Sequence, residues 1–331
     1  MPPEQTKMIN ISDDNFEKQH VINGVVQTGD ELKQYNYLNL GPTHPATHGI
    51  FQNILKMDGE IIVDAQPTIG YIHRAFEKLA ENRPFFQITT ITDRLNYCSA
   101  PINNIGWHLT MEKLLGIETP KRVDYLRVIV MELARIADHI ICNSVVAVDT
   151  GALTGFLYVF QWREKIYDVY EEICGARLTT NMGRIGGFER DFSKSAFDKI
   201  DVIVKELPKA LQEFEKLVIR NRIFMDRTIN VGGISGERAL EYGFTGPNLR
   251  AAGVDYDVRV MNPYCSYQDF DFTIPVGSNG DTYDRFCVRQ EEMWQSLSII
   301  KQAIKNLPEG KHHADVPEFY LPPKDDVYNS M

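Results

Sequence analysis

Two histidines in residues 41–49 are the side chains best suited to chemistry in this sequence. The segment reads GPTHPATHG, so His44 and His48 lie four residues apart, a spacing that puts two metal ligands on one helix face. Pro42 and Pro45 prevent a regular helix and predict a stiff loop. The alternatives are half of a zinc site, a turn whose histidines bind the backbone, and a loop that holds an imidazole for proton transfer. Because the prolines oppose the metal geometry, we expect no metal site here.

A phenol follows in residues 93–98, which read DRLNYC. Tyr97 can donate a hydrogen bond, or a proton, to a carbonyl oxygen that gains electrons. The alternative is that Tyr97 only packs in the interior. A helix is expected to begin near Pro101, directly after this segment.

Asp149 is the single charged residue in the apolar stretch 140–162. The stretch is long enough to cross a bilayer, but a carboxylate near its centre costs about 2.5–3.5 kcal/mol. We therefore expect two buried helices joined near residues 149–151, in a soluble protein without a transmembrane segment. Asp149 is then in apolar surroundings and must be paired, hydrogen-bonded or protonated.

Two charge pairs have helical spacing. Arg74 and Lys78 are four residues apart on an expected helix, and Glu132 and Arg135 are three apart on another. Ordinary surface charge is the favoured interpretation of both pairs.

Composition excludes several classes of protein. The 331 residues carry 35 Lys and Arg against 45 Asp and Glu, a net charge of −10, which excludes an electrostatic nucleic-acid footprint. Five cysteines without a Cys-x-x-Cys pair argue for a reducing compartment and against an iron–sulfur or zinc site of the chain's own. The sequence contains neither the glycine-rich motifs that bind nucleotide phosphates nor the serine-nucleophile motif G-x-S-x-G. The first residues resemble neither a signal nor a transit peptide.

Periodicity indicates the elements that must hold these side chains. An antiparallel β pattern covers residues 34–63, and helical spacing dominates after Pro84, with apolar positions of a bundle helix from Val123 to Ile140. Two or three further helices follow, and one returns at 285–307. We expect an α+β protein with these regions: an extended arm (1–33), a small β region with the histidine loop (34–70), a helical bundle (71–228), an irregular insertion (229–284), a returning helix (285–307) and an extended tail (308–331).

Six motifs carry a resemblance to a known family. They are GPTHPATHG, GYIHRAFEK, TDRLNY, VDTGALTGFLYVF, GARLTTNMGRIGG and LRAAGVDYDVR. In this order they closely resemble the 49 kDa subunit of respiratory complex I, NADH:quinone oxidoreductase, from about Leu38 to Met331. The resemblance implies a fold related to the large subunit of nickel–iron hydrogenases. A hydrogenase itself is a weaker alternative, because Asn96 and Ser99 occupy the positions of two metal-binding cysteines.

The resemblance also implies roles for residues. The quinone-headgroup ligands fall on His48 and Tyr97, and the carboxylate that pairs with the histidine, a proton relay, falls on Asp149. The family's positions next to a partner's terminal tetranuclear iron–sulfur cluster correspond to Arg94, Arg74 and Thr179. His44 is expected to be a secondary residue of the histidine loop.

Partners and location are implied in the same way. The chain alone is expected to bind no cofactor; NADH, FMN and the iron–sulfur clusters belong to partner subunits, and quinone is the substrate. Expected neighbours are the subunit with the terminal cluster, the 30 kDa-type subunit and the membrane subunit at the quinone entrance, with no nucleic acid. The family lies peripherally on the cytoplasmic side of the bacterial inner membrane and couples quinone reduction to proton translocation.

Three departures from the family pattern matter. Asn96 replaces the usual Asp before the tyrosine, and Thr179 replaces a histidine found in many relatives. Without that imidazole we expect a lower, less pH-dependent cluster potential, which suits menaquinone better than ubiquinone. Family members also continue beyond Met331. This shortfall keeps a noncatalytic scaffold chain of the same complex as a second hypothesis.

Overall fold

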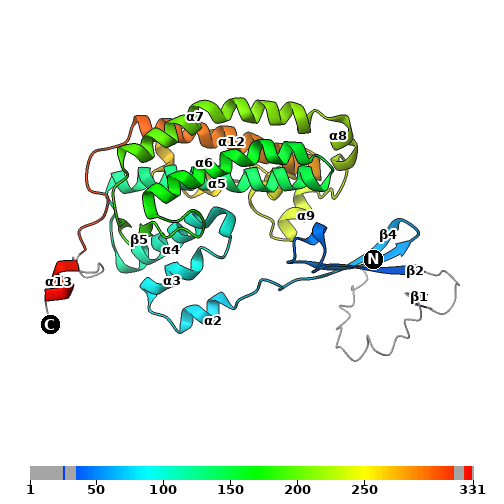
Figure 1. Ribbon diagram of the computed structural model, residues 1–331, viewed down its shortest axis with the longest axis horizontal. Helices are drawn as coiled ribbons and strands as arrows, with labels where there is room; N and C mark the ends of the chain where they lie inside the picture. The colour runs from blue at the N-terminus through cyan, green and yellow to red at the C-terminus, as the bar shows by residue number, and fades with distance from the viewer. Residues whose placement is uncertain (1–24, 27–34, 317–323, 330–331) are drawn as a thin grey trace. The chain divides into compact units, whose positions relative to one another are not determined.

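The computed structural model describes residues 25–26, 35–316 and 324–329, which form two compact units, Met1–Ala75 and Phe76–Met331 (Figure 1). The predicted arm at 1–33 lies outside the described residues except for Val25–Val26. The small N-terminal sheet and the mostly helical remainder confirm the expected mixture of strand and helix.

The first unit is a four-stranded antiparallel sheet in chain order. Its strands are β1 (Val25–Val26), β2 (Tyr35–Leu40), β3 (Gln52–Asp58) and β4 (Ile61–Thr68). Asp58 pairs with Ile61, so β3 and β4 are joined by a two-residue turn in which Gly59 has a φ of +61°. The histidine loop connects β2 to β3.

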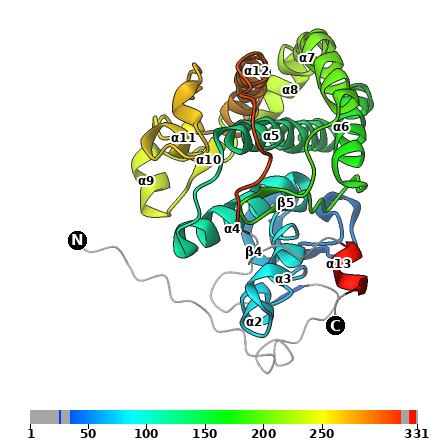
Figure 2. The same cartoon turned by 90° about the vertical axis from the view of Figure 1, so that its left-hand side faces the viewer.

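The second unit is built on four long helices that lie side by side (Figures 1 and 2). They are α5 (Lys121–Asp149), α6 (Leu153–Cys174), α7 (Lys194–Phe214) and α12 (Thr282–Lys305). α5 packs on α6 and α12, and α7 packs on α6 and α12, which closes a four-helix bundle. The predicted apolar positions of α5 are fully buried: Val123, Leu126, Val130, Leu133, Ala137 and Ile140.

Local sequence signals set the ends of the long helices. Ser193 caps α7 by accepting a hydrogen bond from the Ala196 N–H, and Asp281 caps α12 by accepting one from the Asp284 N–H. α6 ends at Cys174 and is capped by Gly175, whose φ of +77° suits glycine. The break between α5 and α6 at residues 150–152 confirms the expected two-helix division of 140–162.

The second unit also contains shorter elements. They are α2 (Phe76–Glu81), α3 (Phe85–Thr92), α4 (Ala100–Leu115), α8 (Arg222–Thr228), α9 (Gly236–Glu241), α10 (Gly246–Ala251), α11 (Val258–Met261), α13 (Lys324–Asn329) and the hairpin β5 (Gly183–Arg184) and β6 (Gly187–Phe188). Within the described residues, no helix is both long enough and apolar enough to cross a membrane.

Three expectations about local structure were wrong. Arg74 is not helical, because Ala75 has a φ of +53° and α2 begins only at Phe76. The insertion at 229–284, expected to be irregular, contains α9, α10 and α11. The tail, expected to be extended, contains α13.

Candidate functional site

The histidine loop is a hydrogen-bonded turn. A 3-10 helix, Pro45–Thr47, is capped by His44, whose Nδ1 accepts the Ala46 N–H at 3.1 Å. The buried Thr47 hydroxyl lies within hydrogen-bond distance of the Pro42 and His44 carbonyl oxygens, at 3.2 and 3.0 Å. Gly41 is required, since its φ is +94° and a Cβ there would lie 2.1 Å from the Phe51 carbonyl oxygen. The loop is therefore stiff, and His44 binds the backbone.

His48 ends this turn. It has a left-handed backbone with a φ of +54°, its N–H donates to the Pro45 carbonyl oxygen, and its side chain is exposed. Histidine tolerates this conformation better than most residues. Within the described residues, no three His, Cys, Asp or Glu side chains gather closely enough to hold a metal ion.

Tyr97 lies on a second tight turn, in the other unit. It begins the 3-10 helix Tyr97–Ser99, which contacts α4 and α5, and 39% of Tyr97 is exposed. The Asn96 side-chain nitrogen donates to the Ser99 hydroxyl at 2.8 Å. These two residues correspond by resemblance to hydrogenase metal ligands, and here they bind each other, so the pair does not fit a nickel site.

The end of α3, just before the turn with Tyr97, carries a buried acid that the sequence did not single out by itself. Asp93 is 5% exposed, and its Oδ1 has no hydrogen-bond partner among the described residues. Burial raises the pKa of this carboxyl, although Arg94 beside it lowers the pKa again. Arg94 itself is exposed.

Asn104 joins the Tyr97 region to Thr179. Its buried side chain accepts a hydrogen bond from the Thr92 hydroxyl at 2.8 Å and donates one to the Thr180 carbonyl oxygen at 2.6 Å. The segment before Tyr97 and the loop at Thr179 are therefore neighbours. Thr179 has a φ of +55°, a strained conformation for a β-branched residue. No signal in the sequence pointed to Asn104.

Asp149 does not have the buried position that we expected. It is the last residue of α5, and it is exposed. The chain turns immediately afterwards: the Thr150 hydroxyl donates to the Val146 carbonyl oxygen, and Gly151 has a φ of +96°. The apolar run is thus interrupted at the end of the bundle, where a carboxylate reaches the surface. His48 and Arg74 belong to the first unit, whereas Arg94, Tyr97, Asp149 and Thr179 belong to the second.

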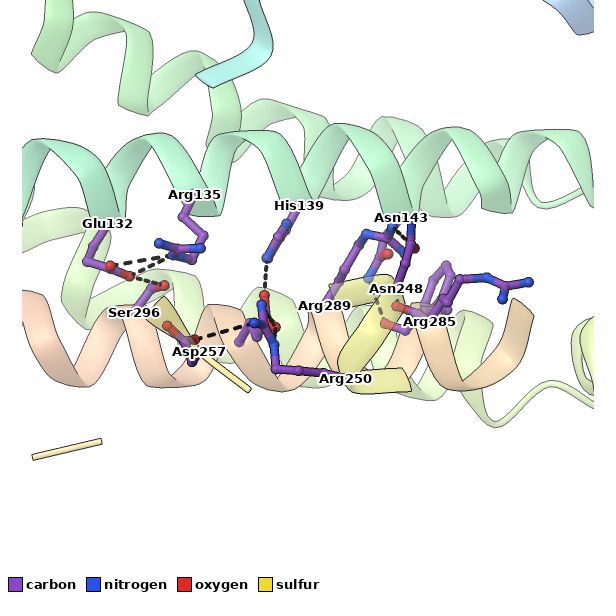
Figure 3. Close-up of polar contacts among 12 residues, drawn as sticks. Glu132, Arg135, His139, Asn143, Asn248, Arg250, Asp257, Arg285, Arg289 and Ser296 are labelled. Carbon is purple, nitrogen blue, oxygen red and sulfur yellow. Dashed lines mark hydrogen bonds and ion pairs between the residues drawn. The ribbon is translucent and has the colours of Figure 1, made fainter. Parts of the chain in front are cut away.

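A buried polar assembly lies between α5 and α12 (Figure 3). Glu132 is fully buried and accepts hydrogen bonds from Arg135, Arg259, Tyr267 and Ser296. Burial alone would raise its pKa, but the charges of Arg135 and Arg259 and the hydrogen bonds lower the pKa to about 2. The interpretation of Glu132 and Arg135 as surface charge was therefore wrong.

The assembly continues as an alternating chain of charges. Asp257 pairs with Arg259 at 2.7 Å and with Arg250 at 3.5 Å, and Arg250 pairs with Glu292 at 2.6 Å. Glu292 is also 2.6 Å from His139. Together with Glu132 and Arg135, this buried assembly contains three acids and three arginines, so its charges balance. We refer to Glu132, Arg135, His139, Arg250, Asp257, Arg259 and Glu292 as the ionic network.

The ionic network has a structural role. Its acids and arginines cancel in charge, and burial lowers the pKa of His139, which favours the uncharged imidazole. Arg250, Asp257 and Arg259 all lie in LRAAGVDYDVR, one of the motifs noted in the sequence. Their contacts explain that motif, because they join the insertion to the bundle.

Comparison with known proteins gives one consistent family. Residues 149–331 match the family model for the respiratory-chain NADH dehydrogenase, 49 Kd subunit. The chain is 73% identical over 306 residues to the D subunit of the NADH-quinone oxidoreductase of Flavobacterium johnsoniae, covering 92% of this chain and 74% of that protein. It is 55% identical to the D subunit of Leptospira biflexa, covering 89% and 72%.

A third relative is named as a C/D subunit, and the match covers a smaller share of it. It is the C/D subunit of the NADH-quinone oxidoreductase of Bdellovibrio bacteriovorus, 48% identical over 313 residues, which are 94% of this chain and 56% of that protein. These matches confirm the resemblance drawn from the six motifs. The chain belongs to the family of the 49 kDa subunit, or D subunit, of the NADH-quinone oxidoreductase complex.

Proposed function

We propose that this chain forms the headgroup end of the quinone channel in a proton-pumping NADH:quinone oxidoreductase, with His48 and Tyr97 as the quinone ligands. The observation that carries the proposal is that both side chains are exposed on tight, hydrogen-bonded turns instead of being packed in the core. Such turns keep a donor in a fixed orientation for a substrate.

The chemistry proposed for these residues is hydrogen bonding followed by proton donation. The Tyr97 hydroxyl and the His48 imidazole donate to the two carbonyl oxygens of the quinone. As those oxygens become anionic, both hydrogen bonds strengthen, and the donors can release their protons. Asp149 stabilises His48 as an imidazolium and then changes its own contacts. A partner's tetranuclear cluster supplies the electrons.

Arg94, Arg74 and Thr179 are proposed to lie near that cluster. The Asn104 bridge supports this for two of them, since it joins the end of α3 to the loop at Thr179. Positive charge from the two arginines favours electron arrival, whereas the absence of an imidazole at Thr179 favours a low potential. Menaquinone is accordingly the proposed substrate in preference to ubiquinone.

The assembly proposed for the chain follows its family. NADH, FMN and the iron–sulfur clusters reside in partner subunits, and this chain binds none of them alone. The relative named as a C/D subunit supports a direct association with the 30 kDa-type subunit. The chain is also proposed to contact the cluster-bearing subunit and the membrane subunit at the quinone entrance. Its proposed location is peripheral, on the cytoplasmic side of the inner membrane. The fold is proposed to be like that of a nickel–iron hydrogenase large subunit. The region boundaries given above are kept in this proposal, except that the insertion and the tail contain short helices.

Coupling to proton pumping is the last part of the proposal. A change in charge on His48 and Asp149 can bias a mobile element and so begin proton movement in the membrane arm. A scaffold chain without quinone chemistry is the competing hypothesis.

The test uses two substitutions of His48 in membranes that contain the assembled complex. His48→Ala removes the imidazole, while His48→Asn keeps an N–H donor and suits the left-handed backbone, so the turn is retained. We expect NADH:menaquinone activity to be lost in His48→Ala and strongly reduced in His48→Asn, with NADH–ferricyanide activity and assembly unchanged. Unchanged quinone turnover in both variants would favour the scaffold.

A further inference from the structure

A cavity of about 670 Å³ lies in the second unit, apart from the residues assigned above. Its walls come from α5, the loop at 232–234, the α9–α10 segment and the start of α12. A volume of this size fits a small organic ligand, for which cavities of roughly 300–1,000 Å³ are usual. Val146, Ile234, Phe244 and Phe286 give it apolar sides, and asparagine, threonine and arginine side chains supply its polar groups.

Three arginines line this cavity: Arg238, Arg285 and Arg289. Within residues 25–26, 35–316 and 324–329, none of them forms an ion pair with a carboxylate, in contrast to Arg250 and Arg259 of the ionic network. Asp281 and Asp284 act on Arg285 electrostatically, but their carboxylates accept backbone N–H groups. The cavity therefore holds a concentration of positive charge in a chain whose net charge is −10.

Two of these guanidinium groups are held in fixed positions by neutral oxygens. Arg285 donates to the carbonyl oxygens of Gly280 at 2.7 Å and Gly232 at 2.9 Å. Arg289 donates to the Arg285 carbonyl oxygen at 3.0 Å and to the Asn248 side-chain oxygen at 3.1 Å. Neutral acceptors orient a guanidinium without cancelling its charge, and each group keeps further N–H donors. Figure 3 shows Arg285, Arg289, Asn248 and Asn143 between α5, α10 and α12.

Like charges this close oppose each other. Burial, and then the charge of Arg289, lower the pKa of Arg285. A bound anion would relieve this repulsion and would receive charge-assisted hydrogen bonds from both groups.

A second, independent feature of the cavity is an unsatisfied buried acceptor. Asn143, which is 1% exposed, donates to the Phe286 carbonyl oxygen at 3.1 Å, but its own Oδ1 has no hydrogen-bond partner among the described residues. A buried acceptor without a donor costs free energy, and a ligand that supplies a donor removes that cost. A hydroxyl on a molecule bound in the cavity would satisfy this acceptor.

We propose that this cavity binds the phosphate group of a phosphorylated polyol, with the phosphate on Arg285 and Arg289 and a hydroxyl on Asn143. The planar guanidinium favours phosphate, whose oxygens it binds in pairs. Two sources share this chemistry: a small soluble sugar or glycerol phosphate, and a glycerophospholipid headgroup. The inference is independent of the quinone site.

The sharpest test changes one atom of Asn248. In Asn248→Asp the isosteric side chain gives Arg289 the carboxylate that it lacks, so the site is neutralised without removing an arginine. Asn82→Asp, at an exposed asparagine, is the control for added negative charge. The probe is glycerol 3-phosphate on the full chain, measured by thermal shift and calorimetry at constant ionic strength, with glycerol and inorganic phosphate as comparisons.

Glycerol 3-phosphate should raise the Tm of the wild-type chain and of Asn82→Asp, and it should bind more tightly than inorganic phosphate, whereas glycerol should have no effect. Binding should weaken at least about tenfold in Asn248→Asp, since charged hydrogen bonds are replaced. Arg289→Gln is a second variant with the same expected loss. Equal binding by wild type and Asn248→Asp, or no binding by wild type, would overturn the proposal.

Vesicles and the assembled complex distinguish the two possible sources of the phosphate, a soluble molecule and a lipid headgroup. Phosphatidylglycerol vesicles that retain the wild-type chain, but not Asn248→Asp, and release it to glycerol 3-phosphate identify a lipid headgroup. Binding of glycerol 3-phosphate without vesicle retention identifies a soluble ligand. If the isolated chain binds but the assembled complex does not, a partner's group fills the cavity and the proposal is wrong.

Discussion

His139 on α5 and Glu292 on α12 are joined by a hydrogen bond of 2.6 Å between Nε2 and Oε2. Both side chains are buried, and Glu292 also holds Arg250. This contact ties the two helices together at the end of the ionic network. The network lets the Gly- and Tyr-rich insertion pack on the bundle without leaving a buried charge unpaired.

Removing the Glu292 charge should strongly destabilise the protein. Glu292→Gln keeps the size of the side chain but leaves the Arg250 cation without one of its two carboxylates, and breaking a buried pair costs about 3–5 kcal/mol. We expect a loss of that order in urea unfolding. The control is Glu291→Gln on the same helix, an exposed position expected to change stability by no more than about 0.5 kcal/mol. Similar losses in the two variants would contradict the account of the ionic network.

Buried histidines should make stability decline on acidification well before the acids protonate. Burial lowers the pKa of His108 from 6.5 to about 3, and it also lowers the pKa of His139. The unfolded chain therefore binds these protons more readily, so stability declines as pH falls from about 6.5 toward 3. A second decline follows from about 4.5 toward 2, where Glu132 and Glu292, whose pKa values are about 2 in the fold, take up protons.

The variant His108→Gln checks this assignment. One titrating histidine contributes a slope of up to about 1.4 kcal/mol per pH unit. Urea unfolding between pH 7 and pH 5 should give a shallower slope for His108→Gln than for wild type, whatever its absolute stability. Identical slopes would show that His108 is not responsible.

Thr179 should determine how the partner's terminal cluster responds to pH. With no imidazole at this position, we expect the cluster potential to be nearly independent of pH. Thr179→His should raise the potential and make it pH-dependent near pH 6.5, the ordinary pKa of the ring. The substitution is compatible with the backbone, because histidine tolerates the φ of +55° better than threonine does. Redox titration of the assembled complex at several pH values measures this; a strongly pH-dependent wild-type potential would refute the role of Thr179.

Much of the fold could be predicted because its signals are local. The apolar rhythm from Val123 to Ile140 depends on one helix, and the break near Gly151 depends on adjacent residues. The antiparallel β pattern over residues 34–63 is local too, because a two-residue turn joins β3 to β4. Prolines at positions 42 and 45 likewise predicted a stiff histidine loop.

The errors arose where tertiary contacts decide. Glu132 has the spacing of a surface pair with Arg135, but Arg259 lies 127 residues away and Ser296 lies 164 away, and these partners make the position buried. Asp149 was expected to be buried because its neighbours in sequence are apolar, yet α5 ends there and exposes it. Asn104 and the cavity arginines also depend on contacts between distant segments, which periodicity cannot report.

The assignment of Tyr97 to the quinone site is tested by comparing two phenols of nearly equal exposure. Tyr97 is 39% exposed on its 3-10 turn and Tyr37 is 38% exposed on β2, so Tyr97→Phe and Tyr37→Phe each remove one hydroxyl from a similar environment. NADH:menaquinone reductase activity is measured in membranes, with NADH–ferricyanide activity as the measure of assembly. We predict a loss of about 10²-fold or more in Tyr97→Phe, typical of a removed proton donor, and wild-type activity in Tyr37→Phe. Equal quinone activity in both variants would contradict the assignment of Tyr97 to the quinone site.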